Sequence, residues 1–177
     1  MASGSGKLKA IITYLEMTER PTHRPHLPVG PAVALFRARN MMPAFYRYLY
    51  REVGREHHWM LRRAMEDAAL DAIINAEETR IDVLYVDGCP AGFFELESSR
   101  LPRDMEIAYF GLIGKYTGMG LGKWLLGAAI DAAWDRQPQM VTVHTNSLDN
   151  PRALPLYQKM GFVPVGRSEE EVDAWED

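Results

Sequence analysis

A glycine-rich turn constrains this chain more than any other feature of its sequence. Gly118, Gly120 and Gly122 alternate with other residues between a strand-like run, residues 105–113, and an apolar helical segment, residues 121–134. The first amides of a helix have no partner inside the helix, and the helix dipole is positive at that end. Glycines let such a backbone approach a phosphate closely because no Cβ stands in the way. The turn therefore predicts an anion-binding site at a strand–helix junction.

Two common phosphate-binding motifs do not fit this turn. Aligning Gly122 and Lys123 with the end of a P-loop puts Thr117 at the first glycine and Trp124 where a serine or threonine must meet magnesium. A dinucleotide fingerprint would put Lys123 at its third glycine. Two interpretations stay open: another phosphate ligand, to which Lys115 and Lys123 would add charge, and a structural turn without a ligand.

The rest of the chain predicts one mixed α/β domain. Strands are expected where short β-branched or apolar runs occur, at residues 10–15, 81–86, 91–96, 105–113, 140–145 and 162–165. Asp87 and Gly88 supply a hairpin turn between the second and third of these runs. Helices are expected across residues 33–76 and 121–134, and from Asn150 to Gly161. The acidic residues 169–177 are expected to form a solvated end.

Length and composition bound the class of protein. The 177 residues suit one domain, placed at residues 7–177 after a flexible leader at residues 1–6. The formal charge of −4 and the lack of an apolar run of about 20 residues argue against nucleic-acid and membrane partners. No signal-peptide pattern is present, so a cytoplasmic location is expected. The single cysteine, Cys89, excludes an internal disulfide, and the histidines lack metal-ligand spacing, so no metal is expected.

Two motifs in the second half of the chain resemble those of the GNAT superfamily of CoA-dependent N-acetyltransferases. The first, (Q/R)-x-x-G-x-(G/A) between a strand and a helix, is matched by residues 117–122, with Thr117 where the family carries arginine or glutamine. This departure removes one charged contact and leaves the backbone amides in place. The second, N-x-x-A-x-x-L-Y-x-K-x-G-F, is matched by Asn150, Ala153, Leu156, Tyr157, Lys159, Gly161 and Phe162.

Two further segments resemble an uncharacterised bacterial subgroup of that superfamily. They are Tyr-Phe-Gly at residues 109–111 and His-Thr-x-x-Leu-Asp at residues 144–149. The superfamily resemblance implies a central mixed, mostly antiparallel sheet of six to seven strands flanked by helices. In that fold the fourth and fifth strands splay apart.

The resemblance also implies acetyl-CoA as cosubstrate. Its pantetheine arm would enter the gap between the splayed strands, and its pyrophosphate would lie on the glycine turn. The Leu112 amide would lie near the thioester oxygen and stabilise the oxyanion. Carried over to this sequence, the cofactor-binding residues are Phe110, Gly111, Leu112, Ile113, Thr117, Gly118, Met119, Gly120, Leu121, Gly122, Lys123, Asn150 and Tyr157.

The implied activity is direct transfer of an acetyl group to a primary amine of a small molecule or peptide. An ammonium must lose a proton before attack, and Glu106 is the candidate general base, with its pKa raised in a partly apolar cleft. Strand alternation puts Glu106 on the face of Leu112. Tyr157 matches the family's general-acid tyrosine, which would protonate the departing CoA thiolate. A solvent-facing glutamate, a packing tyrosine and a non-catalytic CoA-binding module are the alternatives.

The resemblance implies that the helical region after the first strand forms one wall of the acceptor pocket, and in this sequence that region carries aromatic and basic residues. Tyr46, Tyr50 and Trp59, together with His144, are the candidate substrate-binding residues. Packing of these aromatic side chains in the core is the alternative. The expected partner is an amine acceptor, and a homodimer is one assembly open to the chain.

Overall fold

The structure, a computed structural model, describes residues 6–176. Its strands are β1 (Lys7–Met17), β2 (Val33–Arg37), β3 (Thr79–Val86), β4 (Cys89–Glu97), β5 (Asp104–Leu112), β6 (Met140–Asn146) and β7 (Val163–Asp173). Its helices are α1 (Pro43–Gly54), α2 (Asp67–Ile74), α3 (Leu121–Trp134) and α4 (Ala153–Lys159), with 3-10 turns η1 (Arg55–His57) and η2 (Gly114–Tyr116). No helix in this part of the chain is long and apolar enough to cross a bilayer.

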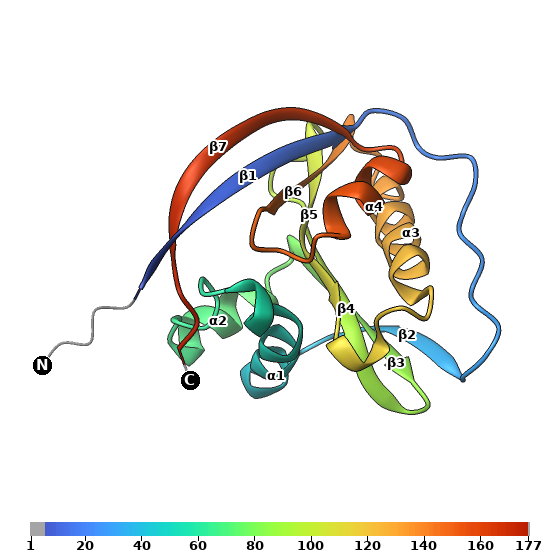
Figure 1. The fold of residues 1–177 in the computed structure, drawn as a ribbon. Coiled ribbons are helices and arrows are strands. Elements are labelled where there is room, and N and C mark those ends of the chain that lie inside the picture. Colours follow the sequence, from blue (N-terminus) through green and yellow to red (C-terminus); the bar gives the residue numbers. More distant parts are fainter. Residues whose placement is uncertain (1–5, 177) are drawn as a thin grey trace, which may run out of the picture.

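All these strands join one sheet in the order β2-β3-β4-β5-β6-β1-β7 (Figure 1). Neighbours run antiparallel except β5 and β6, which are parallel. The predicted mixed, mostly antiparallel sheet flanked by helices is confirmed. β5 and β6 pair only over residues 104–107 and 140–143, and their pairing ends at Ile107 and Val143. The parting strands are the fifth and sixth here because β2 precedes them.

A β-bulge lies where β5 leaves β6. On its other side β5 pairs with β4, and there Leu96 faces Ile107 whereas Glu95 faces Tyr109. Ala108 is therefore the extra residue of the bulge. Since a bulge bends its strand and increases the local twist, it accounts for the divergence of β5 from β6 immediately after Ile107.

The bulge also changes which side chains share a face of the sheet. Phe110 and Leu112 pack with the core under α3, as Ile107 does. Glu106 lies opposite Glu97 of β4, and Tyr109 lies opposite Glu95. Since opposite residues of paired strands share a face, Glu106 and Tyr109 are on the other face of the sheet, together with Glu97 and Glu95. The prediction that Glu106 shares a face with Leu112 is wrong, because simple alternation does not survive an inserted residue.

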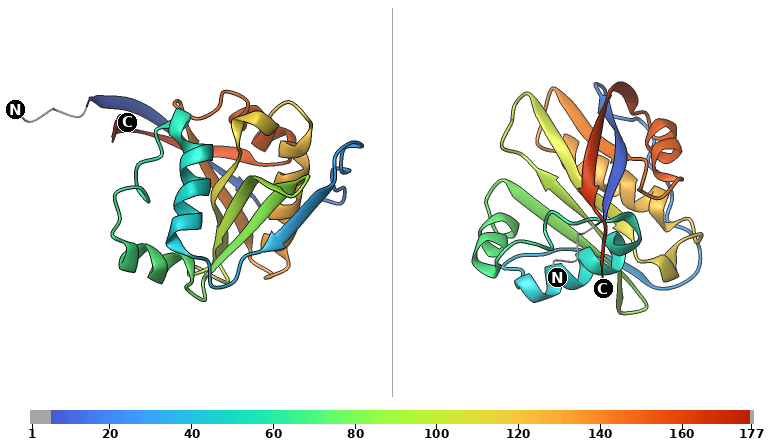
Figure 2. Two further views of the ribbon diagram at one scale, coloured as in Figure 1. Left: turned by 90° about the horizontal axis from the view of Figure 1, so that it is seen from below. Right: turned by 60° about the vertical axis from the view of Figure 1, so that its left-hand side comes forward.

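Two apolar cores cover the two faces of the sheet. On one face α3 packs its small and apolar side chains, such as Leu125 and Ala129, against Phe94 of β4. On the other face α1 and α2 pack residues such as Leu49 and Leu70 against Phe93. Figures 1 and 2 show α3 and α4 on one side of the sheet and α1 and α2 on the other.

Two segments differ from their predicted structure. Residues 33–37 are strand β2 at the sheet edge rather than the start of a helix, because a five-residue apolar run is too short to show a period. The last strand, β7, extends beyond the predicted residues 162–165 to include residues 169–173, and Glu169, Glu170 and Glu171 within it are exposed to solvent, as predicted. They pair with β1, and Lys7 Nζ lies 2.6 Å from Asp173 Oδ1.

The expected leader falls mostly outside the described residues, which exclude residues 1–5. Gly6 belongs to the folded part, because its carbonyl accepts a hydrogen bond of 2.9 Å from the Ala174 amide. The start of β1 and the end of β7 therefore lie side by side, and the pair reaches past α1 in Figure 2.

We predict that Gly92→Ala destabilises the fold by about 1–3 kcal/mol, because a Cβ at this position of β4 overpacks the parting strand. It would lie 2.5 Å from the Gly111 carbonyl oxygen and 3.1 Å from the Leu112 Cα. The matched control is Gly166→Ala in β7, where no atom lies within 4 Å. Urea unfolding measures both variants, and equal midpoints would contradict the prediction.

Candidate functional site

A cavity of about 1140 Å³ opens where β5 and β6 part. Residues 107–112 of β5 form one side, and the loop before α3, the end of β6 and the start of α4 form the others. The segment after α1 and the end of β7 close it on the remaining side. This volume exceeds the roughly 300–1,000 Å³ of a typical small-molecule site, so the cavity has room for a large ligand and a second reactant.

The loop before α3 forms one end of this cavity. Gly118 and Gly120 have φ angles of +79° and +77°, which favour glycine. The Thr117 amide and hydroxyl both donate to the Gly114 carbonyl, at 3.2 and 2.7 Å, and hold the turn. No hydrogen bond among the described residues uses the amides of Gly118, Met119 or Gly120, and the next three amides precede the first intrahelical bond. The loop thus presents unpaired N–H donors.

Positive charge gathers at this end of the cavity. Lys123, on the first turn of α3, and Arg152 and Lys159, at the two ends of α4, line the same space. None of the three forms an ion pair within residues 6–176, and Lys123 lies at the N-terminus of α3 beside the unpaired amides, so the arrangement suits a phosphorylated ligand.

Most of the predicted cofactor-binding residues line the cavity, namely Phe110, Gly111, Leu112, Thr117, Gly118, Gly120, Gly122, Lys123, Asn150 and Tyr157. Ile113, Met119 and Leu121 do not line it. Leu121 is buried in the core under α3, whereas Met119 is exposed. A Cβ at Gly111 would collide with Val53 of α1, so packing against α1 favours glycine at this position.

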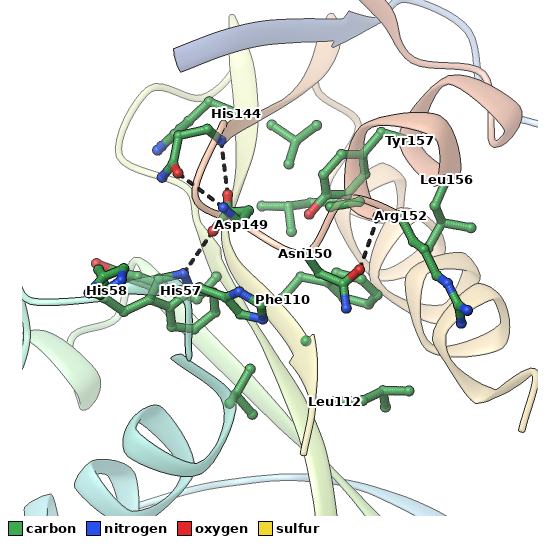
Figure 3. A pocket seen from close by; sticks show the side chains of 18 of the residues that line it. His57, His58, Phe110, Leu112, His144, Asp149, Asn150, Arg152, Leu156 and Tyr157 are labelled. Atoms are coloured by element: carbon green, nitrogen blue, oxygen red, sulfur yellow. Dashed lines mark hydrogen bonds between the residues drawn. The ribbon is translucent and has the colours of Figure 1, made fainter. Parts of the chain in front are cut away.

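Tyr157 places a hydroxyl in the cavity from α4. Its ring packs between Phe110 and Phe162, with centroid distances of 6.1 and 5.9 Å. The side chain is 5% exposed, and its hydroxyl has no hydrogen-bond partner among the described residues. Burial raises the pKa of Tyr157 above its usual value, so the hydroxyl keeps its proton. Figure 3 shows that hydroxyl pointing into the cavity.

Asn150 combines a structural contact with a free polar group. Its Oδ1 accepts a hydrogen bond of 3.0 Å from the Arg152 amide just before α4, as a helix cap does (Figure 3). Its side-chain amide nitrogen has no partner among the described residues and is available to a ligand in the cavity.

Glu106 lies beside the cavity and not in its lining. Its Oε2 accepts a hydrogen bond of 3.0 Å from Arg100, and its Oε1 lies 3.4 Å from His144 Nδ1. These two neighbours, His144 first, lower the pKa of Glu106 below its usual value. The predicted rise in this pKa is wrong, because the cationic partners outweigh burial.

His144 is the residue through which this pair meets the cavity. It follows Val143, the last residue of β6 that pairs with β5, and it lines the cavity. The Glu106 carboxylate raises the pKa of His144 above the usual 6.5 of histidine.

Two of the three aromatic residues predicted to form an acceptor wall lie at the cavity. Tyr50 and Trp59 line the cavity, but Tyr46 does not. Tyr46 is fully buried, and its hydroxyl donates to Glu95 Oε2 at 2.6 Å in the core between α1 and the sheet. Among the four candidate substrate residues, only Tyr46 is thus placed away from the cavity.

Two sets of carboxylates lining the cavity were not identified from the sequence. Asp149 accepts hydrogen bonds from Trp59 Nε1 at 3.1 Å and from Thr145 Oγ1 at 2.7 Å, and so links the segment after α1 to the end of β6. Its signal was the His-Thr-x-x-Leu-Asp segment. The others are Glu170, Glu171 and Asp173 of β7. Nothing in their local sequence signals a strand beside a site. No cluster of three or more potential metal ligands occurs within residues 6–176.

Comparison with known proteins bears on the class of this site. Residues 41–162 match the family model described as the acetyltransferase (GNAT) family. No protein of curated function matches the chain in sequence.

Several solved structures share the fold. A tandem GNAT protein from the clavulanic acid biosynthesis pathway is 15% identical with a TM-score of 0.65, over 94% of this chain and 54% of its own. A GCN5-related N-acetyltransferase from Kribbella flavida is 15% identical with a TM-score of 0.61, over 97% and 61%. An aminoglycoside acetyltransferase from an uncultured soil metagenomic sample is 14% identical with a TM-score of 0.55, over 72% and 86%. The chain thus spans between half and two-thirds of the length of the first two of these proteins.

We predict that Gly118→Ala weakens CoA binding about tenfold, which corresponds to about 1.4 kcal/mol. The added methyl group meets no protein atom within 4 Å, so it would stand in the space before the unpaired amides. Gly88→Ala is the matched control, because this hairpin glycine also has a positive φ and open surroundings but lies outside the cavity. Calorimetry with CoA compares the two, and equal losses of affinity would contradict the prediction.

Proposed function

Since the chain belongs to the acetyltransferase (GNAT) family, we propose that it transfers an acetyl group from acetyl-CoA directly to a primary amine of a small molecule or peptide. One observation carries this proposal. Unpaired amides at the α3 N-terminus and the unpartnered Tyr157 hydroxyl open into the same cavity, which passes between the parted β5 and β6.

The residues of the cavity fit acyl-CoA. The amides of residues 118–123, with Lys123, would hold the pyrophosphate, since N–H donors at a helix N-terminus favour a phosphate. The edge of β5 that faces away from β4, no longer paired with β6 from Ala108 onward, and the side-chain amide nitrogen of Asn150 would hold the pantetheine arm. When bound, acetyl-CoA supplies a thioester, the activated acyl group of the reaction.

Tyr157 is proposed to act as the general acid. Its raised pKa keeps the hydroxyl protonated, and the hydroxyl has no competing partner among the described residues, so it is free to donate to the departing thiolate. The Leu112 amide is proposed to stabilise the oxyanion. Removing one preorganised side-chain donor from an oxyanion hole costs about 2.7–4 kcal/mol, which gives the scale for a backbone donor in the same role.

The group that takes the proton from the amine is proposed to belong to the Glu106–His144 pair. His144 of this pair and Tyr157 line one cavity, which supports an enzyme over a non-catalytic CoA-binding module. The acceptor is proposed to enter past Tyr50 and Trp59. One structural neighbour is titled an aminoglycoside acetyltransferase, and aminoglycosides are therefore one class of amine worth including in a panel.

Thiol release tests the proposed function. The full-length protein is mixed with acetyl-CoA and a panel of primary amines that includes aliphatic amines, aromatic amines, aminoglycosides and peptides. Amine-dependent release of CoA thiol, with an acetylated amine found by mass spectrometry, supports the proposal. CoA binding without thiol release from any amine would favour the binding module instead.

We predict that Tyr157→Phe lowers kcat about 100-fold, the low end of the contribution of general acid–base catalysis. The affinity for CoA is expected to change less than threefold. The ring packing on Phe110 and Phe162 is kept, and no hydrogen bond within the described residues is lost. Stopped-flow thiol release gives kcat, and calorimetry gives the Kd for CoA. A variant with an unchanged kcat would remove the acid role from Tyr157.

A further inference from the structure

His144 lines the cavity at the point where β5 and β6 separate. Val143 of β6 is the last residue paired with β5, opposite Ile107, so His144 follows at the point where the two strands separate. Its side chain is 43% exposed, and it lines the cavity. Tyr157 reaches the same cavity from α4 (Figure 3).

The neighbour of His144 fixes the state of its ring. Nδ1 lies 3.4 Å from Glu106 Oε1, an ion-pair contact slightly longer than an optimal hydrogen bond. A carboxylate only accepts, so the neutral ring keeps its proton on Nδ1, and the lone pair is on Nε2. With Nδ1 turned toward Glu106, the Nε2 edge of the ring is left for the cavity.

Glu106 itself is poorly suited to contact an amine. It does not line the cavity, and both of its oxygens are engaged, one by Arg100 and the other by His144. Its lowered pKa keeps the Glu106 carboxylate ionised near neutral pH. An ionised carboxylate stabilises a neighbouring imidazolium well, but with a lowered pKa it is a poor base for an ammonium.

Two other histidines line the cavity, and neither has this arrangement. His58 Nδ1 accepts a hydrogen bond of 2.9 Å from the Trp175 amide, so its lone pair is already used. His57 Nδ1 lies 3.3 Å from the Leu148 carbonyl and has no carboxylate partner among the described residues to stabilise a charged ring.

We propose, resting on the proposed acyl transfer, that His144 is the catalytic base that takes the proton from the amine and that Glu106 is a positioning residue. Glu106 holds the His144 ring in the Nδ1–H tautomer and stabilises the imidazolium that forms. The arrangement repeats the logic of a carboxylate orienting a catalytic imidazole.

The proton transfers balance. The acceptor ammonium loses one proton to His144 Nε2, which passes it to solvent. The neutral amine then forms a C–N bond with the thioester carbon, and the C–S bond breaks. The departing sulfur takes the proton of the Tyr157 hydroxyl, and the second N–H proton restores that hydroxyl through water. The products are an N-acyl amine, CoA thiol and one proton released to solvent.

The charges around His144 set the sign of its pH dependence. Glu106 faces it from β5, Asp149 from the loop after β6 and Glu170 from β7, and all three raise its pKa, Glu106 the most. Tyr14 of β1 packs beside it with ring centroids 6.1 Å apart. A base must be neutral to act, so activity is lost as the pH falls through a His144 pKa above 6.5.

We predict a kcat/KM acidic limb with a midpoint above pH 6.5 in the wild type, measured with each amine that the panel shows to be acetylated. In Glu106→Gln the midpoint moves to lower pH, because the largest cause of the raised pKa is gone, and activity above the limb falls less than about tenfold. His144→Gln loses about 100-fold at every pH above the wild-type midpoint. His57→Gln keeps the wild-type midpoint, and His26→Gln, on an exposed loop outside the cavity, keeps both midpoint and rate.

Two outcomes would overturn the proposal. If Glu106 were the base, its lowered pKa would put the limb below pH 4.5, and Glu106→Gln would lose activity at all pH values without a shift. An acceptor-independent arm uses ¹⁵N NMR of the histidine side chains, where a neutral His144 protonated on Nε2 contradicts the proposed role of Glu106. If no amine is acetylated, the proposed function fails, whereas the NMR result still decides the tautomer.

Discussion

The parting of β5 from β6 is the constraint on which the rest of the site depends. Seven strands form one sheet that lies between two apolar cores. The neighbouring strands β5 and β6 stop pairing after Ile107 and Val143. The extra residue Ala108 bends β5 away while β4 keeps pairing with β5 as far as Leu112. The sheet therefore stays intact on one side of β5 and opens on the other, and an extended ligand arm can enter without breaking a core.

The cavity offers two kinds of surroundings. At one end, unpaired amides before α3 and the cations Lys123 and Lys159 favour phosphate. Aromatic side chains after α1 and the carboxylates of β7 line the same cavity, as do Tyr157 from α4 and His144 from β6. The proposed acyl transfer would use both kinds of surroundings, because the carrier is anionic and the acceptor arrives as a cation.

The backbone of the glycine turn and the hairpin could be predicted from the sequence because both depend on local chemistry. Gly118 and Gly120 adopt positive φ, and the Asp87–Gly88 turn joins β3 and β4. Prediction failed where the outcome depends on distant residues. The face of Glu106 depends on a bulge that shows only in pairing with β4, and the charged end of β7 is a strand because β1 offers it an edge and Lys7 a counter-charge. Tyr46 shows the spacing of a pocket wall, but Glu95, 49 residues away, draws it into the core.

The most direct test of the account is a ¹⁵N-labelled amide spectrum of the full chain titrated with CoA. We expect saturable chemical-shift changes for the amides of Gly118, Gly120 and Gly122 and of residues 108–112 of β5, and no change for the Gly88 amide. Shifts confined to other surfaces, or none at saturating CoA, would contradict the claim that the parted strands and the α3 N-terminus form one acyl-CoA site.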